Sequence, residues 1–454
     1  MHRLTIRNLG PIEDCNVEFP GLSVYTGFQA SGKSTIAKSV FYFRTIKEDI
    51  IALSEEIALG VRETEPEESG GSFSRQLLSR LRFKFLNTFG SSWAMHPGMY
   101  LEYRFTETFR IAIRLMKDGT YPAPNYIWFD LSPAMESFLR SDAVKLYAGP
   151  LGVSGEQKEK LRDELERQFD DPYESVYIPA GRSMLTLLSE QLSYIYSTMR
   201  DSQKRTIDHC TRDYIERILR VKPEFSNGME GLLEFSPSQG AADREAVALS
   251  LSLIRKTLRG RYVYSGGEER IEIDDSRFVK LNFASSGQQE SVWILNLLFY
   301  YLVQRHPVFL IIEEPESNLF PESQKYISEL IALAANHGHS ALITTHSPYV
   351  LGTLNNLLYA GQQPEELTEA AGKVIPRQLW ISGSSFDARF VANGTAENCL
   401  DAELHMVQNE RIDEISDVIN QDFDAILALH DSAEHFDECP GKSPDESSGD
   451  FPEG

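Results

Sequence analysis

Residues 22–40 read LSVYTGFQASGKSTIAKSV, in which an apolar stretch leads into an octapeptide bounded by glycines and then into a helical pattern. The octapeptide, residues 27–34, fits G-x-x-x-x-G-K-[ST], whose backbone N–H groups surround phosphate oxygens at the start of a helix. By composition, a chance match in a chain of this length is an event of roughly 1–2%. The sequence therefore predicts a nucleoside triphosphate site between a strand and a helix.

In a loop of this kind the lysine reaches the β- and γ-phosphates, and the hydroxyl that follows helps to hold Mg²⁺. We therefore expect Lys33 to contact the triphosphate and Ser34 to be a ligand of the metal ion. The residues of the loop predicted to bind nucleotide are Gly27, Gln29, Ala30, Ser31, Gly32, Lys33, Ser34 and Thr35.

A second motif, VFLIIEEPE, occupies residues 308–316. Five apolar residues predict a buried parallel strand, and two carboxylates follow at its C-terminal end, where α/β proteins bind ligands. Successive strand residues point in opposite directions, so the two acids can have different tasks. We expect Glu313 to hold Mg²⁺ and Glu314 to orient and deprotonate the attacking water. Such a strand is often merely structural, and it is the phosphate-binding loop that favours the catalytic interpretation.

Two further motifs follow strand-like segments. ASSGQQE, residues 284–290, precedes an apolar helical run, and its small residues at a helix N-terminus form a second phosphate cradle. A simple helix cap is the alternative. ALITTHSP, residues 341–348, brings His346 to the end of an apolar strand, where it is a candidate γ-phosphate contact. The residues of the first motif predicted to bind nucleotide are Ser285, Ser286, Gly287 and Gln288.

These four motifs, in this order, resemble those of the ABC/SMC ATPase superfamily, and more specifically those of bacterial OLD-like and RecF-like AAA-type ATPases. The similarity is strongest over residues 1–45 and 278–355, which include EEPESNLFP (313–321) and TTHSP (344–348). The resemblance implies an α/β fold with an ABC-type P-loop NTPase core, an antiparallel β subdomain and an enlarged inserted helical lobe. It also implies an ATPase that uses ATP and Mg²⁺. Its catalytic residues would be Glu314, His346 and Lys33.

The resemblance implies a head-to-tail homodimer, or a higher oligomer, in which residues 285–287 of one subunit close over the γ-phosphate bound by the other. Ser317 and Asn318 would then lie at the dimer seam. Family members also carry a loop that contributes a glutamine to the metal ion. The stretch from Tyr177 to Ser183 resembles that loop but has no glutamine, which leaves Arg182 as a substitute.

The predicted organisation has a core, a helical lobe and a C-terminal part. Residues 1–130 and 300–400 form the ATPase core lobe, and residues 131–299 form a mainly helical lobe that ends in the 284–290 motif. Residues 401–429 form C-terminal helices, and residues 430–454 form an acidic, disordered tail.

The composition of the chain argues against several kinds of binding partner. The formal net charge of -23 weakens any nonspecific attraction to nucleic acid or anionic lipid. The longest nearly apolar run, residues 292–303, is shorter than the ~20 residues of a membrane helix and predicts a buried core helix instead. The sequence shows no secretory signal, and its four cysteines are scattered, so we expect a reduced, cytoplasmic protein with no membrane partner.

Two functions follow from the resemblance. The first is an ATPase subunit that regulates a separate effector protein, a nuclease in bacterial anti-phage defence, as in Septu-type and PARIS-type systems. OLD nucleases carry a TOPRIM nuclease domain, but Asp422 and Asp424 lie here in an amphipathic helical pattern, so we expect no nuclease in this chain. The alternative is a RecF-like repair ATPase that acts directly on DNA. Its basic residues would lie in residues 75–84, whose apolar spacing also suits an ordinary amphipathic helix.

Overall fold

The structure is a computed structural model, and it divides into two compact units, residues 1–408 and 409–454. Among the residues that it describes, no helix is long and apolar enough to cross a lipid bilayer. The described residues are 1–61, 72–116, 126–150, 152–187, 194, 196–200, 207–235, 243–401, 403–408 and 418–429.

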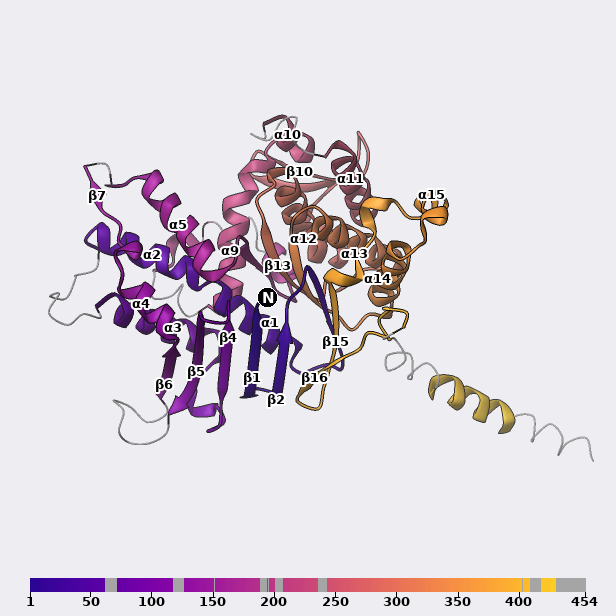
Figure 1. The fold of residues 1–454 in the computed structure, drawn as a ribbon. Helices are drawn as coiled ribbons and strands as arrows, with labels where there is room; N and C mark the ends of the chain where they lie inside the picture. Colours follow the sequence, from indigo (N-terminus) through magenta and orange to yellow (C-terminus); the bar gives the residue numbers. More distant parts are fainter. Residues whose placement is uncertain are drawn as a thin grey trace, which may run out of the picture. The chain divides into compact units, whose positions relative to one another are not determined.

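The core of the larger unit is a six-stranded sheet with the order β16-β15-β3-β14-β13-β9 (Figure 1). All neighbours are parallel except β16, which pairs antiparallel with β15 at one edge. Every residue of β3, β13 and β14 is buried, which explains why these segments are unbroken apolar runs in the sequence. The strands are β3 (Leu22–Thr26), β9 (Glu174–Ile178), β13 (Val308–Glu313), β14 (Ser340–Thr344), β15 (Phe386–Ala392) and β16 (Thr395–Asn398).

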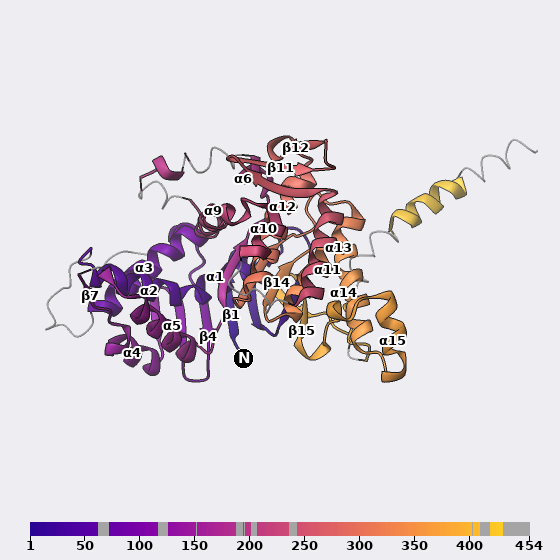
Figure 2. The same ribbon diagram turned by 90° about the horizontal axis from the view of Figure 1, so that it is seen from above.

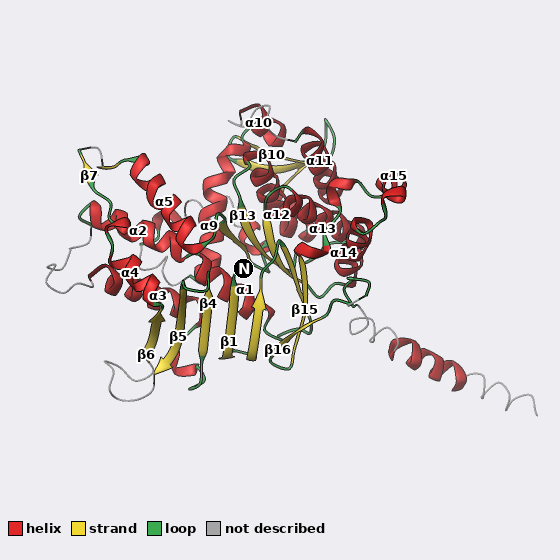
Figure 3. Ribbon diagram, in the orientation of Figure 1, coloured by secondary structure: helices red, strands yellow, loops and turns green. Residues whose placement is uncertain are grey.

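Helices pack on this sheet and on one another (Figure 3). Helix α1 contacts β9, β13 and β14, while α13 contacts α11, α12 and α14. Helix α12 contains the apolar run 292–303 and buries all of it except Tyr300, which is half-buried, so the predicted core helix is confirmed. The helices are α1 (Lys33–Arg44), α11 (Arg244–Leu258), α12 (Ser286–Gln304), α13 (Pro321–Asn336), α14 (Pro348–Gly361) and α15 (Glu365–Val374).

A second, antiparallel sheet has the order β2-β1-β4-β5-β6. Helices α2, α3, α4 and α5 lie beside it in both ribbon views (Figures 1 and 2), and α2 and α3 share its apolar core. The predicted α/β fold with an antiparallel β subdomain is therefore confirmed. The elements are β1 (Arg3–Leu9), β2 (Ile12–Glu18), β4 (Tyr100–Arg104), β5 (Arg110–Met116), β6 (Tyr126–Leu131), α2 (Ile46–Ala58), α3 (Ser72–Phe89), α4 (Pro133–Arg140) and α5 (Gly155–Phe169).

The region predicted to be a helical lobe, residues 131–299, is divided in the structure. Helices α4 and α5 share the apolar core of the antiparallel sheet. Strand β9 lies inside this range but pairs in parallel with β13 and so belongs to the core sheet. Its five residues are flanked by helical sequence, and the pairing partner is more than a hundred residues away, so local pattern does not reveal it. The remaining elements of this range are β7 (Ala148–Gly149), β8 (Gly152–Val153), α6 (Ser183–Leu187), α9 (His209–Val221), α10 (Gly228–Phe235), β10 (Arg261–Ser265), β11 (Glu268–Glu272) and β12 (Phe278–Lys280).

The C-terminal unit contributes one described helix, residues 418–429, in which every side chain is exposed. It contains Asp422 and Asp424, as the amphipathic pattern predicted. Residues 401 and 403–408 are not helical, although the prediction placed C-terminal helices from residue 401, and Val407 forms an isolated bridge with Leu400. The predicted tail, residues 430–454, lies outside the described residues.

A buried polar cluster around His2 joins the first strand to α1 and to the end of α5. His2 Nδ1 lies 3.0 Å from Nη1 of Arg44 and 3.1 Å from the hydroxyl of Tyr103, so this nitrogen accepts. His2 Nε2 lies 3.0 Å from the carbonyl oxygen of Phe169, so it donates. Burial, with Arg44 next, lowers the pKa of His2 from 6.5 to about 4, against the opposing charge of Asp171. The imidazole is therefore neutral in the fold.

Acid should destabilise the protein through His2. The unfolded chain binds the proton near pH 6.5 and the folded protein only near pH 4, so the free energy of unfolding falls as pH falls between these values. The full loss is on the order of 3 kcal/mol. We expect His2→Gln to flatten this dependence, measured by urea unfolding from pH 7 to 4. The exposed His405→Gln is the control. Equal slopes in all three proteins would contradict the assignment.

Candidate active site

The phosphate-binding loop, residues 27–35, connects β3 to α1, and its conformation requires glycine at both ends. The backbone φ is +137° at Gly27 and +112° at Gly32. A Cβ on Gly27 would lie 2.2 Å from the carbonyl oxygen of Val391, and one on Gly32 would lie 2.4 Å from Cδ1 of Ile12. Both distances are far inside van der Waals contact, so a side chain at either position would displace the loop.

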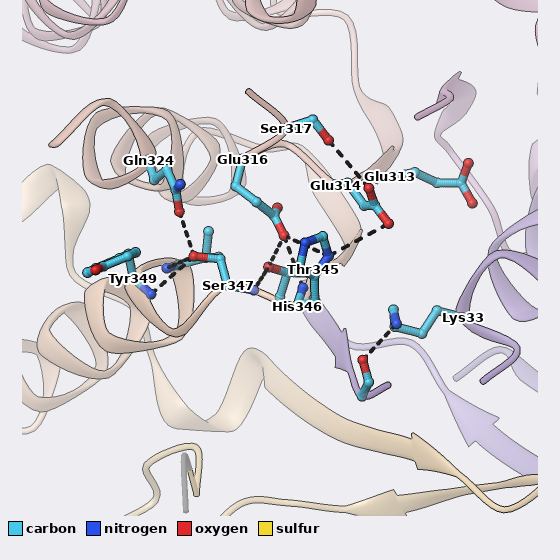
Figure 4. A network of polar contacts seen from close by, with 12 residues as sticks. Lys33, Glu313, Glu314, Glu316, Ser317, Gln324, Thr345, His346, Ser347 and Tyr349 are labelled. Atoms are coloured by element: carbon cyan, nitrogen blue, oxygen red, sulfur yellow. Dashed lines mark hydrogen bonds and ion pairs between the residues drawn. The ribbon is translucent and has the colours of Figure 1, made fainter. Parts of the chain in front are cut away.

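Lys33 begins α1, and its ammonium folds back over the loop (Figure 4). Its Nζ donates to the carbonyl oxygens of Gly27 and Phe28, each at 2.8 Å. Burial lowers the pKa of Lys33, and the nearby carboxylates, Glu314 first, oppose that shift. The two carbonyl oxygens accept from two of its three N–H donors and do not neutralise the charge, so the ammonium favours an anionic ligand such as a phosphate.

Glu313 ends β13 with its carboxylate buried. Its Oε2 accepts a hydrogen bond from the N–H of Ala180 at 3.3 Å, and its Oε1 has no hydrogen-bond partner among the described residues. An unpartnered buried carboxylate oxygen is costly, and a cation would satisfy it. The described residues contain no group of three or more metal-ligating side chains, but Mg²⁺ at triphosphate sites needs only one or two protein ligands. Glu313 and the exposed Ser34 therefore fit Mg²⁺.

Glu314 follows at the edge of the sheet with φ +44°, which is uncommon for a residue with a side chain. Its N–H donates to the carbonyl oxygen of Thr344 at 2.9 Å. Its carboxylate is about one third exposed: Oε2 accepts from the hydroxyl of Ser317 at 3.4 Å, and Oε1 lies 3.7 Å from Nδ1 of His346. Figure 4 shows this carboxylate and that of Glu313 pointing in different directions. The geometry suits two separate tasks.

Glu316 organises the turn that carries His346. Its carboxylate is buried, and Oε1 accepts from the hydroxyl of Thr345 at 2.7 Å and from the N–H of His346 at 3.0 Å. The same oxygen lies 3.6 Å from His346 Nδ1, while the imidazole itself is exposed. No role was predicted for Glu316 from the sequence, although it is the third carboxylate of the EEPE run at residues 313–316.

The 285–288 motif forms the N-terminal cap of α12. Ser285 Oγ accepts from the N–H of Gln288, and Gln288 Oε1 accepts from the N–H of Ser285, which is a reciprocal capping box. Ser285 therefore caps the helix, and the contact of this motif with a phosphate stays a prediction. Ser285 and Ser286 are nevertheless exposed. A Cβ on Gly287 would lie 2.6 Å from the carbonyl oxygen of Asn318, so the motif packs against that residue.

Arg182 does not occupy a metal position. Its side chain is completely buried, and its guanidinium donates to backbone carbonyl oxygens, including those of Glu313 and Glu314. The suggestion that it replaces the family's metal-binding glutamine is therefore wrong, because a guanidinium already bound to carbonyls has no lone pair for a cation.

The structure thus divides the predicted residues into two groups. Lys33, Glu314 and His346 lie together at the C-terminal ends of β3, β13 and β14 (Figure 4). The 285–288 motif lies instead against Asn318. Of the remaining loop residues, Gln29, Ala30 and Ser34 are exposed, while Ser31 and Thr35 are half-buried.

Comparison with known protein families supports the prediction that the chain is an ATPase. Residues 151–351 match the AAA ATPase domain family, a range that includes β9, α12, β13 and β14. No curated protein sequence matches the chain. The predicted fold class and enzyme class are confirmed: the chain has an α/β P-loop fold and is an ATPase, a class of enzyme that uses ATP.

Solved structures that are similar to the chain include three SMC head domains. One is an SMC head bound to the C-winged helix domain of ScpA, with 12% identity, 88% of this chain and 97% of that chain covered, and a TM-score of 0.40. The SMC head domain of Thermotoga maritima is 13% identical, with 77% of this chain and 90% of that chain covered and a TM-score of 0.32. The third is an SMC head domain with an extended coiled coil, bound to the C-terminal domain of ScpA derived from Pyrococcus furiosus. It is 11% identical, with 92% of this chain and 100% of that chain covered and a TM-score of 0.36. Identities and TM-scores this low carry no functional assignment.

Proposed function

We propose that the chain binds ATP with Mg²⁺ at residues 27–35 and hydrolyses it with Glu314 as the base. The observation that carries this proposal is the grouping of Lys33, Glu314 and His346 at one edge of the core sheet (Figure 4). When bound, Mg²⁺ would neutralise phosphate charge, and Ser34 and Glu313 would hold it.

Each residue of this group has a task that its contacts support. Glu314 is partly exposed and braced by Ser317, so it can orient a water molecule and take its proton. Lys33 supplies positive charge to the phosphates. His346 presents an exposed imidazole from a turn that Glu316 fixes, which suits a contact with the γ-phosphate.

We propose that the complete site requires two subunits in a head-to-tail dimer, which higher oligomers would repeat. Ser285 and Ser286 are exposed, and the motif packs beside Asn318, so both elements present one surface to a second copy. In this arrangement residues 285–288 of one subunit would cover the triphosphate held by the loop of the other.

Mixed dimers test this arrangement. Lys33→Ala damages the loop and Ser286→Arg damages the covering motif, and each variant alone should be inactive. After subunit exchange, half of the dimers are mixed and each has one intact composite site, so about one quarter of the wild-type ATPase rate should return. Lys33→Ala mixed with Glu314→Gln is the matched control, because both lesions lie in the same half-site and no activity should return. Recovery of ATPase activity in the control mixture would contradict the composite site. So would the absence of recovery in the mixture of Lys33→Ala with Ser286→Arg, once subunit exchange has been verified.

We propose that this ATPase regulates a separate effector protein, a nuclease in bacterial anti-phage defence, as the resemblance implies. The helix of residues 418–429 supports a protein partner, since Val418, Ile419, Phe423 and Ile426 are each about half or more exposed. Affinity purification of Glu314→Gln from its native cells, in ATP and Mg²⁺, tests the proposal. A stoichiometric second protein supports it, and DNA without such a protein favours the RecF-like alternative.

The contacts of α3 give the DNA alternative little support. Lys84 is buried and contacts Asp49, Arg80 pairs with Asp49 and Glu56, and Arg82 donates to the carbonyl oxygen of Ile127. These basic groups are therefore engaged within the chain, as the amphipathic pattern of residues 75–84 indicated. Direct action on DNA would require binding with a steep salt dependence.

A further inference from the structure

Arg182 connects the end of the strand that carries the acids to the helix that begins with the 285–288 motif. Its Nη1 donates to the carbonyl oxygens of Pro179 and Glu313, at 2.5 and 2.6 Å. Its Nη2 donates to the carbonyl oxygen of Glu314 at 3.0 Å, and its Nε to that of Glu290 at 3.1 Å. One buried side chain thus holds the backbone of three separate segments.

The carboxylate of Glu290 completes the connection from the side of α12. Its two oxygens accept hydrogen bonds from the N–H groups of Arg182 and Ser183, each at 3.0 Å, and it lies 3.4 Å from Arg182 Nε. The hydroxyl of Thr186 donates to the carbonyl oxygen of Gln289 at 2.9 Å. The loop after β9 is therefore fixed to the first turns of the helix that Ser285 caps.

We infer that Arg182 is the positioning residue that holds Glu314 in its catalytic conformation and couples it to the 285–288 motif. Glu314 has a left-handed backbone, which a side chain disfavours, so outside contacts must maintain it. The hydrogen bonds from Arg182 to its carbonyl oxygen and from its N–H to Thr344 do so. This inference rests on the proposed role of Glu314 as the base.

The proposed coupling runs from the 285–288 motif to Glu314. In the proposed dimer, the 285–288 motif contacts the nucleotide of the partner, whereas Glu314 acts on the nucleotide of its own subunit. A shift at the start of α12 therefore reaches Glu314 through Glu290 and Arg182. Closure over one nucleotide would thereby position the base at the other.

Arg182→Lys tests the inference, because a lysine keeps the charge but has only three N–H donors on a single nitrogen and cannot make the four hydrogen bonds that the guanidinium makes through three nitrogens. We expect kcat for ATP hydrolysis to fall about 10–100-fold, since a small displacement of the base is sufficient for such a loss. The Kd for ATP should stay within about threefold, because the phosphate-binding loop is unchanged. Hydrogen exchange of residues 308–319 without nucleotide should become faster, which is a readout independent of activity.

Arg217→Lys is the matched control. Arg217 is also buried and also joins β9 to α12, through Glu174, Ser175 and Tyr301, but at the other end of both elements. We expect a comparable loss in Tm with kcat near that of the wild type. Equal loss of kcat in both variants would mean that Arg182 is merely structural and would overturn the inference.

Two further variants separate the outcomes. If Arg182→Lys does not fold, Glu290→Gln removes the charge that holds the guanidinium, and it should also lower kcat with little change in Kd; wild-type kcat there overturns the inference. If Glu314→Gln itself retains turnover, the proposed base is wrong. If Glu314→Gln loses turnover and Arg182→Lys does not, only the positioning role fails.

Discussion

Replacing Glu314 with glutamine should lower the rate of ATP hydrolysis by about 10²–10⁴-fold while leaving ATP binding intact. The amide has the size of the carboxylate and can still contact Ser317 and His346, so the geometry of the site is kept. It cannot accept a proton from water, however. A chain that binds ATP and cannot hydrolyse it should accumulate in the closed, dimeric state.

Phosphate release, fluorescent-nucleotide titration and light scattering measure the three parts of this expectation. Glu322→Gln, at the exposed start of α13, controls for the loss of one carboxylate in the same segment and should behave as the wild type. Turnover near the wild-type rate in Glu314→Gln would remove Glu314 as the base. A parallel loss of ATP affinity would instead mean that the carboxylate has a structural role.

The parts of the site that the sequence predicted are local. The loop at residues 27–35 is followed by its helix, and β13 and β14 are buried on both sides, so each leaves a continuous signal. The position of Glu313 and Glu314 was predicted in the same way, because α/β proteins bind ligands at the C-terminal ends of their parallel strands.

The parts that the sequence did not predict depend on distant partners. Arg182 looked like a candidate ligand because only its own stretch, residues 177–183, was visible; its actual partners are Glu290, Glu313 and Glu314, more than a hundred residues away. The conformation of Glu314, with φ +44°, likewise leaves no trace in the identity of the residue.

The 285–288 motif shows a different limit. The serine that caps α12 and the serine that would contact a phosphate require the same residue type at the same helix position. The sequence therefore cannot separate the two roles, and the capping box does not either, because Ser286 stays exposed and would be available to the second subunit of the proposed dimer.

Lys33→Ala should weaken ATP binding by about 10–100-fold, because it removes a charge-assisted hydrogen bond to the phosphates. It should not lower the stability of the protein without nucleotide. Burial lowers the pKa of Lys33, which means that the fold disfavours its charged form, and alanine removes that unfavourable contribution. The wild type bears this cost in full at neutral pH, and the cost disappears as pH rises from the lowered pKa of the folded protein to the ordinary pKa of 10.5.

Thermal unfolding with and without ATP and Mg²⁺ separates the two effects. Lys33→Ala should match or exceed the wild-type Tm without nucleotide and should lose most of the rise in Tm that saturating ATP produces. Lys38→Ala is the control on the same helix: it breaks the contact with Asp208, 3.2 Å away, so it should lower Tm slightly and keep the response to ATP. A large drop in Tm for Lys33→Ala would show that its bonds to Gly27 and Phe28 brace the loop, and an unchanged response to ATP would show that the triphosphate binds elsewhere.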